Sequence, residues 1–342
     1  MKAKHHLLPS FWYAAARSAE VTAKPVTRRV CGIDVTLYRL SNGQIRCVQA
    51  YCPHRGADFG LGRIKGDHLV CPYHGWEFDS RGVLACVPSI TDGSCPSLQI
   101  KTFPVQEAAS YIWVFPGETA LSEQVPLGIP GRVQNPALRA VPFGGMWHAH
   151  HTRVVESVLD VAHLPFVHPN TIGTPDRPGC ETLQFGVVES SMLIFPPGNK
   201  SKEAPPPLPR VIESTEALER FSEGRPCIRF TFPNQWLLQI PMGGERYMYQ
   251  YVTFTPIDEE RTMIYGLAMR THFKNIPFFD KLVGRQSNRV LNQDKAVVES
   301  QRPRQVPYEI RAEAHVFADG PQVQYRRMLR NHLVENQDSS HA

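Results

Sequence analysis

Short runs of β-branched and aromatic residues, separated by turn residues, make up the first third of the chain. Residues 31–40 (CGIDVTLYRL) and 44–51 (QIRCVQAY) flank the pair Asn42-Gly43, which favours a two-residue hairpin turn. Further on, the runs WEFD and VLACVPS flank a Ser-Arg-Gly turn in the same way. We therefore predict a small all-antiparallel β domain at residues 1–118.

The rest of the chain has a different pattern. A stretch rich in Pro and Gly and without periodicity predicts a linker at 119–140. Beyond it, β-rich runs alternate with two helical stretches at 153–164 and about 276–301, and a Pro-rich stretch at 195–210 predicts a surface loop. We expect residues 141–342 to form an α+β domain, with an antiparallel sheet packed against the long C-terminal helix.

Composition narrows the class of protein without identifying it. With 42% hydrophobic and 20% charged residues, the chain resembles an ordinary soluble globular protein. Its formal charge of +5 is spread along the sequence, which argues against a nucleic-acid partner. No apolar run approaches the roughly 18 residues of a membrane span. Pro9 and Ser10 interrupt the apolar part of the N-terminus, so we interpret it as a first strand and predict a cytoplasmic protein.

The eight cysteines do not suggest a disulfide framework. Only Cys52 and Cys71 lie in a pattern with neighbouring histidines. The other six are interpreted as buried free thiols: Cys31, Cys47, Cys86, Cys95, Cys180 and Cys227.

The pattern around those two cysteines predicts a metal centre. Cys52-Pro53-His54 is followed, after sixteen residues, by Cys71-Pro72-Tyr73-His74. A Rieske [2Fe–2S] cluster needs two thiolates on one iron and two imidazoles on the other, so each loop must supply one Cys and one His. A structural zinc site is the alternative, but zinc modules more often pair like ligands within a loop. Four unrelated residues are a poor explanation for two mirrored loops.

The segment CPHRGADFGLGRIKGDHLVCPYHGW at 52–76 resembles the Rieske motif of the ring-hydroxylating and demethylating non-haem iron oxygenases. Respiratory Rieske proteins carry two further cysteines that form a disulfide beside the cluster. This chain has Ala57 and Tyr73 at those positions. The resemblance is therefore to the oxygenase and ferredoxin branch, whose clusters donate electrons at lower potential.

A second set of candidate ligands begins at Asp160, His163 and His168. Asp160 and His163 are three apart and would share one face of a helix. His168 would point away from His163 on an ideal helix, but Pro165 permits a bend that brings the two imidazoles together. Two histidines are part of a 2-His-1-carboxylate triad, which leaves iron(II) positions open for O2.

Asp294 is the candidate for the missing carboxylate. It falls on a helical stripe with apolar Val290, Leu291, Val297 and Val298, where a carboxylate is costly unless paired or metal-bound. Taken singly, each candidate has an ordinary explanation, since the histidines can be satisfied core residues and Asp294 can accept a hydrogen bond from the backbone. The combination favours an iron site.

The pattern Asp-x-x-His-x4-His followed by a late helical Asp resembles the catalytic domain of the same oxygenases. With the Rieske motif, the resemblance covers essentially the whole chain in the family's domain order. It implies an N-terminal Rieske domain, a helix-grip (START-like) catalytic domain, and a mononuclear Fe(II) held by His163, His168 and Asp294. It also implies a head-to-tail homotrimer, in which one subunit's cluster lies beside the next subunit's iron.

The resemblance assigns a catalytic role to Asp160 as the carboxylate that links His74, across the subunit interface, to His163. An ordinary surface charge is the alternative role. One departure from the family affects the neighbouring position. The family often has Glu-Asn-x-x-Asp, whereas this chain has Ser157 in place of the Asn. The amide is therefore missing near the iron, and the proposed ligands are unaffected.

The length resembles terminal oxygenase (alpha) subunits of the vanillate O-demethylase and dicamba monooxygenase type. Monohydroxylation or oxidative demethylation of a small aromatic substrate with O2 is therefore the first prediction. Cis-dihydroxylation of an aromatic ring is the second, and a Rieske electron carrier without oxygenase activity is the third. NAD(P)H is expected to act indirectly, through a separate flavin reductase or ferredoxin, because no dinucleotide-binding fingerprint is present in the sequence. Arg55, Arg63 and Lys65 are candidates to steer such a partner, or are simply solvated charges.

Overall fold

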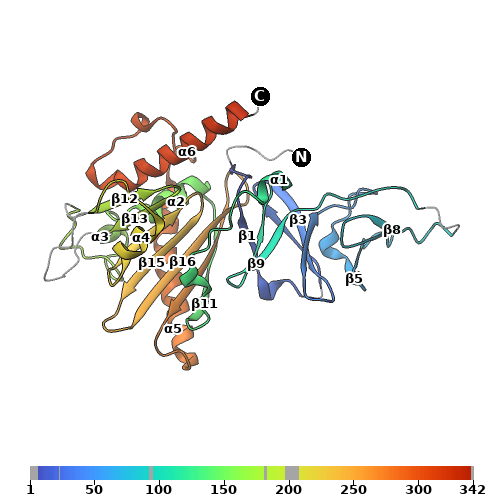
Figure 1. The fold of residues 1–342 in the computed structure, drawn as a ribbon, viewed down its shortest axis with the longest axis horizontal. Helices are drawn as coiled ribbons and strands as arrows, with labels where there is room; N and C mark the ends of the chain where they lie inside the picture. The colour runs from blue at the N-terminus through green and yellow to red at the C-terminus, as the bar shows by residue number, and fades with distance from the viewer. Residues whose placement is uncertain (1–6, 23, 92–94, 181–182, 197–207, 340–342) are drawn as a thin grey trace. The chain divides into compact units, whose positions relative to one another are not determined.

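The β-rich and mixed parts of the sequence form separate units in the computed structural model, which describes residues 7–22, 24–91, 95–180, 183–196 and 208–339 (Figure 1). One unit comprises Met1–Gly128 with Thr255–Asp258, and the other comprises Ile129–Phe254 with Glu259–Ala342. Most of the Pro-rich stretch predicted as a surface loop, 195–210, lies outside the described residues.

Unit 1 consists of three small sheets, with strand orders β1-β10-β9, β2-β3-β4 and β5-β6-β7-β8. Its strands are β1 (Tyr13–Arg17), β2 (Val26–Val30), β3 (Ile33–Arg39), β4 (Ile45–Gln49), β5 (Arg63–Lys65), β6 (His68–Val70), β7 (Glu77–Phe78), β8 (Leu84–Cys86), β9 (Val105–Ala108) and β10 (Tyr111–Val114). The predicted hairpin turn joins β3 to β4, with Gly43 at a φ of +84°, a conformation that glycine adopts without steric cost.

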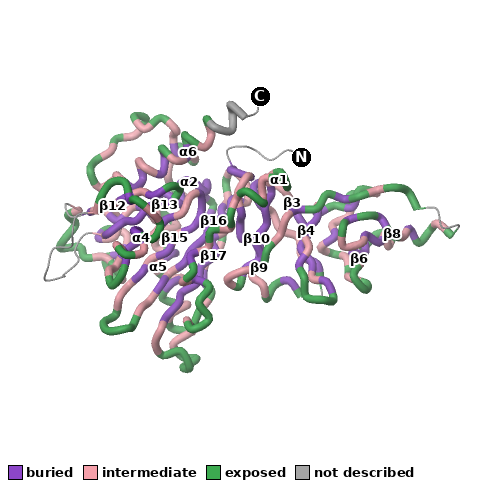
Figure 2. The backbone as a smooth tube through the Cα atoms, in the orientation of Figure 1, coloured by how far each residue is buried: buried purple, intermediate pink, exposed green. Residues whose placement is uncertain are grey.

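Two buried clusters stabilise unit 1, as the purple segments of its strands indicate (Figure 2). One lies beneath β1 to β4 and includes Val35, Leu37 and Ile112. The other includes Phe59 and Phe78, whose rings meet edge to face at 5.4 Å between centroids. The second cluster also contains both patterned cysteines, so the candidate cluster loops are anchored in the hydrophobic core.

Unit 2 contains a seven-stranded sheet of order β11-β17-β16-β15-β14-β13-β12. The strands are β11 (Arg139–Trp147), β12 (Gln184–Val188), β13 (Ser191–Phe195), β14 (Cys227–Thr231), β15 (Gln235–Pro241), β16 (Tyr247–Pro256) and β17 (Thr262–Arg270). The helices of the chain are α1 (Thr119–Ser122), α2 (His151–Leu159), α3 (Leu164–Val167), α4 (Thr215–Ser222), α5 (Pro277–Ser300) and α6 (Gly320–Ser339). The predicted fold class, an all-β domain followed by an α+β domain with a large antiparallel sheet, is confirmed.

Alternation along the central strands separates two faces of this sheet. Trp236 pairs with Phe230 and donates from Nε1 to the Val158 carbonyl of α2 at 2.9 Å. Phe230 contacts Tyr325 of α6 edge to face at 5.6 Å. On the same face, the Gln250 amide donates to Ser287 of α5 at 3.0 Å. Helices α2, α5 and α6 therefore lie on one face of the sheet.

Helix α5 is tied to β11 and its extension by a series of polar contacts. The tied pairs are Arg139 with Asp280 (3.0 Å), the Gly144 amide with Asn288 (3.0 Å), Lys295 with the Met146 carbonyl (3.0 Å) and the His148 amide with Glu299 (2.7 Å). Each pair lies further along both elements than the one before. The helix thus runs alongside the strand in a fixed register.

The structure corrects the predicted helix at 153–164. Helix α2 ends at Leu159, because the Asp160 side chain accepts the backbone N–H groups of Ala162 (2.7 Å) and His163 (3.3 Å) and closes a turn. Pro165 lies in the first turn of the next short helix, α3, where its missing N–H costs nothing. The second predicted helix, about 276–301, corresponds to α5.

All eight cysteines are free, but the prediction of six buried thiols holds for only three. Cys31, Cys47 and Cys227 are buried, Cys86 and Cys180 are half-buried, and Cys95 is exposed. The exposed thiol follows from its position in the segment 95–98, which has no regular secondary structure.

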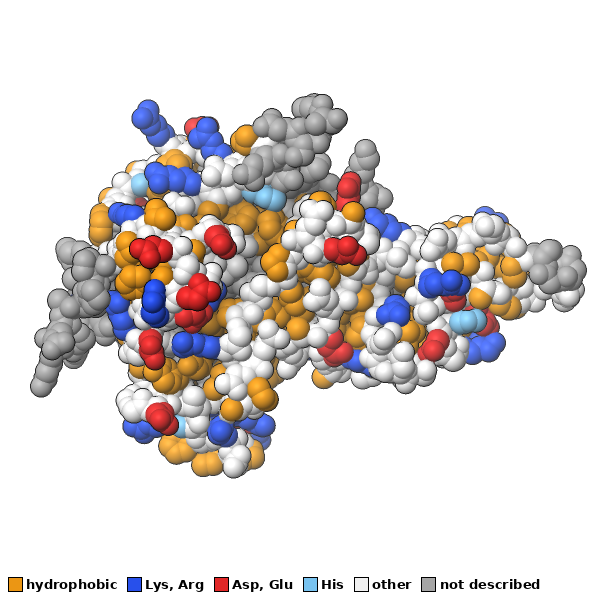
Figure 3. All heavy atoms as spheres, in the orientation of Figure 1, with side chains coloured by type: hydrophobic (Ala, Val, Ile, Leu, Met, Phe, Trp, Pro, Cys, Tyr) orange, Lys and Arg blue, Asp and Glu red, His pale blue; other side chains and the backbone are white. Residues whose placement is uncertain are grey.

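Charged side chains of both signs are interspersed on the face shown in Figure 3, in keeping with the spread of charge along the sequence. Within the ranges that the structure describes, no helix is long and apolar enough to cross a membrane.

Candidate functional site

The two Cys/His loops of unit 1 share one backbone frame. In each loop the cysteine N–H donates to the carbonyl five residues on, at 2.9 Å for both Cys52 and Cys71. The cysteine carbonyl accepts from the glycine four residues on, at 2.8 Å from Gly56 and 3.2 Å from Gly75. These glycines have φ values of +70° and +69°, which favour glycine strongly. The loops are therefore equal in length, although the histidine lies two residues after one cysteine and three after the other.

The four predicted cluster ligands lie together at the ends of these loops. Cys52 and Cys71 are each 2% exposed, and the rings of His54 and His74 are 4.6 Å apart between centroids. Trp76 stacks on His54 at 4.5 Å and 5°. The Nδ1 atom of His54 is buried without a hydrogen-bond partner in the described structure, as expected of a nitrogen that serves as a metal ligand.

The electrostatics of the loops also fit a metal cluster. Burial raises the pKa of the Cys52 thiol to about 11, and the adjacent Cys71 thiol adds to the effect. Burial and the neighbouring His74 hold the pKa of His54 below its ordinary value. Two buried thiols side by side become thiolates only beside a compensating cation, and neutral imidazoles are the ligand form of histidine. The donor set of two sulfurs and two imidazoles fits a Rieske [2Fe–2S] cluster.

In unit 2, the predicted iron ligands converge on one point. His163 Nε2 and His168 Nε2 lie 3.2 Å apart, and Asp294 Oδ1 lies 3.3 Å from the first and 2.9 Å from the second. Neighbouring ligands at right angles around a metal are about 3 Å apart when each bond is about 2.1 Å. The three atoms therefore fit one face of a metal's coordination sphere.

Short elements position the two histidines. His163 precedes α3 and His168 ends it, with the His168 N–H donating to the Leu164 carbonyl at 3.1 Å. A single helical turn between them, rather than a bend in a longer helix, brings both imidazoles to the same side. Asp294 comes from α5, whose register on the sheet is fixed by its contacts with β11. The side chains of His168, Asp294 and His163 are 1%, 15% and 19% exposed, so water has little access to the ligand atoms.

Carboxylates on both sides of His163 raise the pKa of its imidazole. Burial by itself would lower the pKa of His163, but Asp160 and Asp294 outweigh it and raise the pKa to about 9. Asp160 Oδ2 lies 3.8 Å from His163 Nδ1, which is an ion-pair distance, and the Asp160 side chain is 31% exposed. Nδ1 of His163 therefore faces Asp160, while Nε2 faces the other ligands.

Ser157 does not replace the amide that the family often has at this position. Its hydroxyl donates to the Val154 carbonyl within α2 at 2.8 Å, so its hydrogen bond is used inside the helix. The side chain is too short to reach beyond that turn and offers the metal site no amide.

Gln293 contacts the site but has no marker in the sequence. Gln293 Oε1 lies 3.0 Å from His168 Nδ1 and 2.8 Å from the Thr171 hydroxyl. Trp236 holds the end of α2 through the Val158 carbonyl. The alternation along β15 marks Trp236 as inward-facing, but no spacing rule identifies Gln293.

Four large side chains of β15 and β16, namely Trp236, Leu238, Tyr247 and Tyr251, divide between the two faces of the sheet. Trp236 and Leu238 share the face that carries α2 and α5. Tyr251 pairs with Leu237, and its hydroxyl donates to Gln235 at 2.9 Å on the opposite face, and Tyr247 has the same parity along β16. Only the first two side chains lie on the side of the candidate metal centre.

A buried ion-pair cluster supports α2 just before the metal ligands. Arg326 of α6 donates to Glu156 at 2.6 Å, and Arg153 contacts Glu156 at 3.1 Å and Glu313 at 2.6 Å. Arg153 and Arg326 are 5% and 3% exposed as side chains. The cluster links α2, α6 and the segment between α5 and α6.

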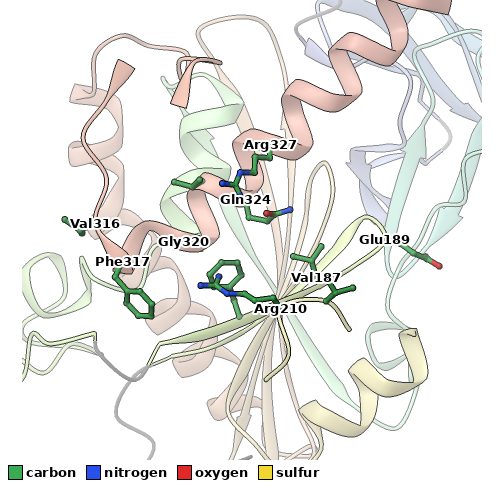
Figure 4. Close-up of a pocket in the computed structure, with 11 residues that line it drawn as sticks. Val187, Glu189, Arg210, Val316, Phe317, Gly320, Gln324 and Arg327 are labelled. Carbon is green, nitrogen blue, oxygen red and sulfur yellow. The ribbon is translucent and has the colours of Figure 1, made fainter. Parts of the chain in front are cut away.

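A cavity of about 730 Å³ lies elsewhere in unit 2, between β12 and α6 (Figure 4). It is lined by Val187, Arg210, Phe317 and Arg327, among others, and Arg210 lies 4.3 Å from the centre of the Phe185 ring. None of the eight predicted site residues lines it. The candidate metal chemistry therefore does not belong to this cavity.

Two protein-family models match the chain. The model described as the vanillate O-demethylase oxygenase C-terminal domain matches residues 147–335, more than half of the chain. The model described as the Rieske [2Fe–2S] domain matches residues 11–104. Together with the oxygenase relatives below, they confirm the cofactors predicted from the sequence, a Rieske cluster and a mononuclear iron.

Curated and solved relatives are oxygenase components. The chain is 35% identical over 185 residues to the dicamba O-demethylase oxygenase component of Stenotrophomonas maltophilia, covering 54% of this chain and 52% of that protein. It is 30% identical over 164 residues to the vanillate O-demethylase oxygenase subunit of Pseudomonas sp. strain HR199, covering 47% and 45%. The chain thus spans about half the length of the curated relatives it matches. The crystal structure of dicamba monooxygenase bound to dicamba is similar over 97% of this chain and 98% of that one, with a TM-score of 0.78 and 26% identity.

Proposed function

The chain belongs to the vanillate O-demethylase oxygenase family, and we propose that it is a terminal oxygenase component that monohydroxylates or oxidatively demethylates a small aromatic substrate. The observation that carries the proposal is the convergence of two imidazoles and one carboxylate within 2.9–3.3 Å. When bound, the iron supplies O2 activation, with electrons relayed through the Rieske cluster. The relatives' names, which specify O-demethylation of dicamba and of vanillate, support the reaction class.

Each predicted ligand has a role in this proposal. Cys52, His54, Cys71 and His74 hold the cluster, and the mononuclear iron is held by His163, His168 and Asp294. We take residues 1–118 as the Rieske domain, 119–140 as the linker and 141–342 as the catalytic domain. Trp236 and Leu238, on the sheet face toward α2 and α5, are the proposed pocket-lining residues.

Asp160 is proposed to link the two centres across a head-to-tail homotrimer. Its carboxylate faces His163 Nδ1 at 3.8 Å while its side chain stays 31% exposed, and His74 is exposed at its loop tip. One carboxylate is thus available both to an imidazole of its own chain and to one from a neighbouring copy. This arrangement orients both rings and carries negative charge between them.

A separate reductase or ferredoxin, fed by NAD(P)H, is the proposed electron donor, and the cytoplasm is the proposed location. Arg55 and Arg63 are exposed beside the cluster loops and suit an acidic partner surface. Lys65 is less suitable, because it pairs with Glu77 at 2.7 Å. Arg55 and Arg63 therefore remain as the two candidates for attracting an acidic electron-transfer partner.

The test combines iron content with coupled turnover. The purified, reconstituted protein is expected to hold about three irons per chain, two in the cluster and one mononuclear. With a generic NADH-dependent reductase, oxygen uptake is measured against a panel of aromatic acids and aromatic methyl ethers, and products are identified. About two irons and no product would favour an electron carrier, and a cis-diol would favour ring dihydroxylation.

The variant Asp160→Asn separates electron transfer from metal binding. It should keep both metals, because Asp160 is not a proposed ligand, yet lose turnover coupled to the reductase. Single-turnover product from the pre-reduced enzyme should also form more slowly, because an electron must still pass from the cluster to the iron. Normal steady-state turnover in this variant would remove Asp160 from the pathway.

A further inference from the structure

The buried imidazole of His168 is held at both of its nitrogens by consecutive residues of one helix. Nε2 lies 2.9 Å from Asp294 Oδ1, and Nδ1 lies 3.0 Å from Gln293 Oε1. Successive residues on a helix point about 100° apart, which allows the two α5 side chains to reach the ring from different sides. At 1% exposure, the ring has no access to water as an alternative partner.

The amide of Gln293 is itself fixed by Thr171. The Thr171 hydroxyl donates to the same Gln293 oxygen at 2.8 Å. Thr171 in turn belongs to the turn that follows His168, since its N–H donates to the His168 carbonyl at 3.1 Å. Two donors, one from the ring and one from the turn, thus converge on a single amide oxygen.

This arrangement selects one tautomer of the ring. A carbonyl oxygen only accepts, so the Nδ1 atom beside Gln293 must carry the proton. The lone pair then lies on Nε2, which faces Asp294 and His163. That is the form of histidine that binds a metal through Nε2.

The two histidines differ in what faces their second nitrogen. Nδ1 of His163 faces the carboxylate of Asp160, which is partly exposed to solvent. Nδ1 of the buried His168 ring faces the neutral amide of Gln293. A second buried carboxylate next to Asp294 would add like charge at high cost, whereas an amide accepts the same hydrogen bond without a charge.

We propose that Gln293 is a positioning residue that sets the tautomer and the ring orientation of His168 for metal binding. The inference rests on the proposed iron site. Because Gln293 and Asp294 are neighbours on α5, this helix supplies one ligand, Asp294, and also positions a second ligand, His168. Removing the amide oxygen frees Nδ1 from its acceptor and allows the tautomer with the proton on Nε2, which cannot bind the metal.

The test measures metal affinity and the ligand-field spectrum rather than activity. Protein with its cluster in place is stripped of mononuclear iron and titrated with Fe(II), and with Co(II) as a spectroscopic probe. Gln293→Leu should bind both ions about 10- to 100-fold more weakly, with an altered Co(II) absorption spectrum. Gln293→Glu keeps an acceptor beside Nδ1, and because the positive charge of the bound metal offsets the added carboxylate, it should recover part of the affinity lost in Gln293→Leu.

Asn292→Leu is the matched control, since it replaces an exposed amide one residue earlier on α5 and should leave affinity and spectrum unchanged. If Gln293→Leu fails to fold, Thr171→Val removes only the hydroxyl that fixes the amide and should weaken binding several-fold. Wild-type affinity and spectrum in Gln293→Leu, or in a folded Thr171→Val if the former is lost, would overturn the inference. Unchanged binding in His163→Ala would instead overturn the iron site itself.

Discussion

The two candidate metal centres are built in opposite ways. The four cluster ligands lie within residues 52–74, on two loops that repeat the same backbone hydrogen bonds. The iron ligands come from a short turn and from a helix, and Asp294 lies 126 residues after His168. The first centre depends on local loop conformation, and the second depends on the packing of α2, α3 and α5 on the sheet.

This difference predicts that a substitution at one centre will leave the other centre unaffected. A change in a cluster loop should affect the cluster and spare the mononuclear site, since the ligand sets share no residue. A change in helix packing far from the iron should affect unit 2 and spare the cluster.

Replacing a cluster ligand should remove the cluster alone. In Cys71→Ala a buried thiol at the core of its loop is lost, and iron content should fall from about three to about one per chain. Visible absorption of the cluster and iron analysis are the measurements. Asp294→Ala is the reciprocal variant and should lose about one iron while retaining the cluster spectrum. Loss of all iron in both variants would show that the two centres depend on each other.

The buried ion-pair cluster offers a change remote from both metals. Glu313→Gln leaves the buried guanidiniums of Arg153 and Arg326 to share Glu156. Breaking a buried pair on one side costs about 3–5 kcal/mol, so the free energy of unfolding of unit 2 should fall by that order. Denaturant titration followed by tryptophan fluorescence measures it, with the cluster spectrum as an internal reference. Glu309→Gln, at an exposed position, should change stability by less than about 0.5 kcal/mol.

Lowering the pH should reduce the contribution of Glu313 to the free energy of unfolding of the wild type. Hydrogen bonds from Arg153 and Arg326 outweigh burial and hold the pKa of Glu313 at about 2, below its usual 4.5. A carboxyl with a depressed pKa stabilises the fold above its unfolded value and loses that effect as it is protonated. The stability difference between wild type and Glu313→Gln should therefore be largest above pH 4.5 and narrow as the pH falls toward 2. A constant difference over that range would rule out Glu313 as the titrating group.

The smallest expected effect concerns the glycines that let the two Cys/His loops form the same backbone hydrogen bonds. Gly75 has a φ of +69°, and Gly75→Ala should cost about 1–2 kcal/mol of local strain, which should speed cluster loss under a chelator several-fold. Gly66→Ala is the control, because its φ of +59° carries similar strain in open space away from the ligands. Equal rates of cluster loss in the two variants would argue against a special role of the loop conformation at Gly75.

Local patterns allowed the sequence to predict the β domain, α5 and the cluster motif. Asn42-Gly43 marks a turn by itself, and two Cys/His loops are recognisable because ligand and glycine spacing are set by nearest neighbours. The end of α2 was mispredicted for a related reason. Apolar residues continue past Asp160 at helical spacing, and only the side chain of Asp160, which binds two backbone N–H groups, ends the helix there.

Contacts between distant segments could not be predicted. Glu313 pairs with both Arg153 and Arg326 because three elements pack together, and no periodicity in any one of these elements indicates the contact. The sequence gives no sign of the role of Gln293 either. On a helix it points in a different direction from Asp294, and it reaches His168 only because of where the turn after α3 lies. Resemblance to a family supplied the candidate ligands, whereas the supporting residues required coordinates.

The ties between α5 and β11 set a limit on how this chain can change in length. From Asp280 to Glu299, nineteen helical steps of 1.5 Å span about 28 Å, and from Arg139 to His148, nine strand steps of 3.3 Å span about 30 Å. The helix and the strand therefore cover nearly the same distance along the whole of their contact. A one-residue insertion within α5 before Asp294 would turn the rest of the helix by about 100° and carry Gln293 and Asp294 away from His168. Variation in length among functional relatives should thus be confined to loops, with this helix and this strand kept free of insertions and deletions.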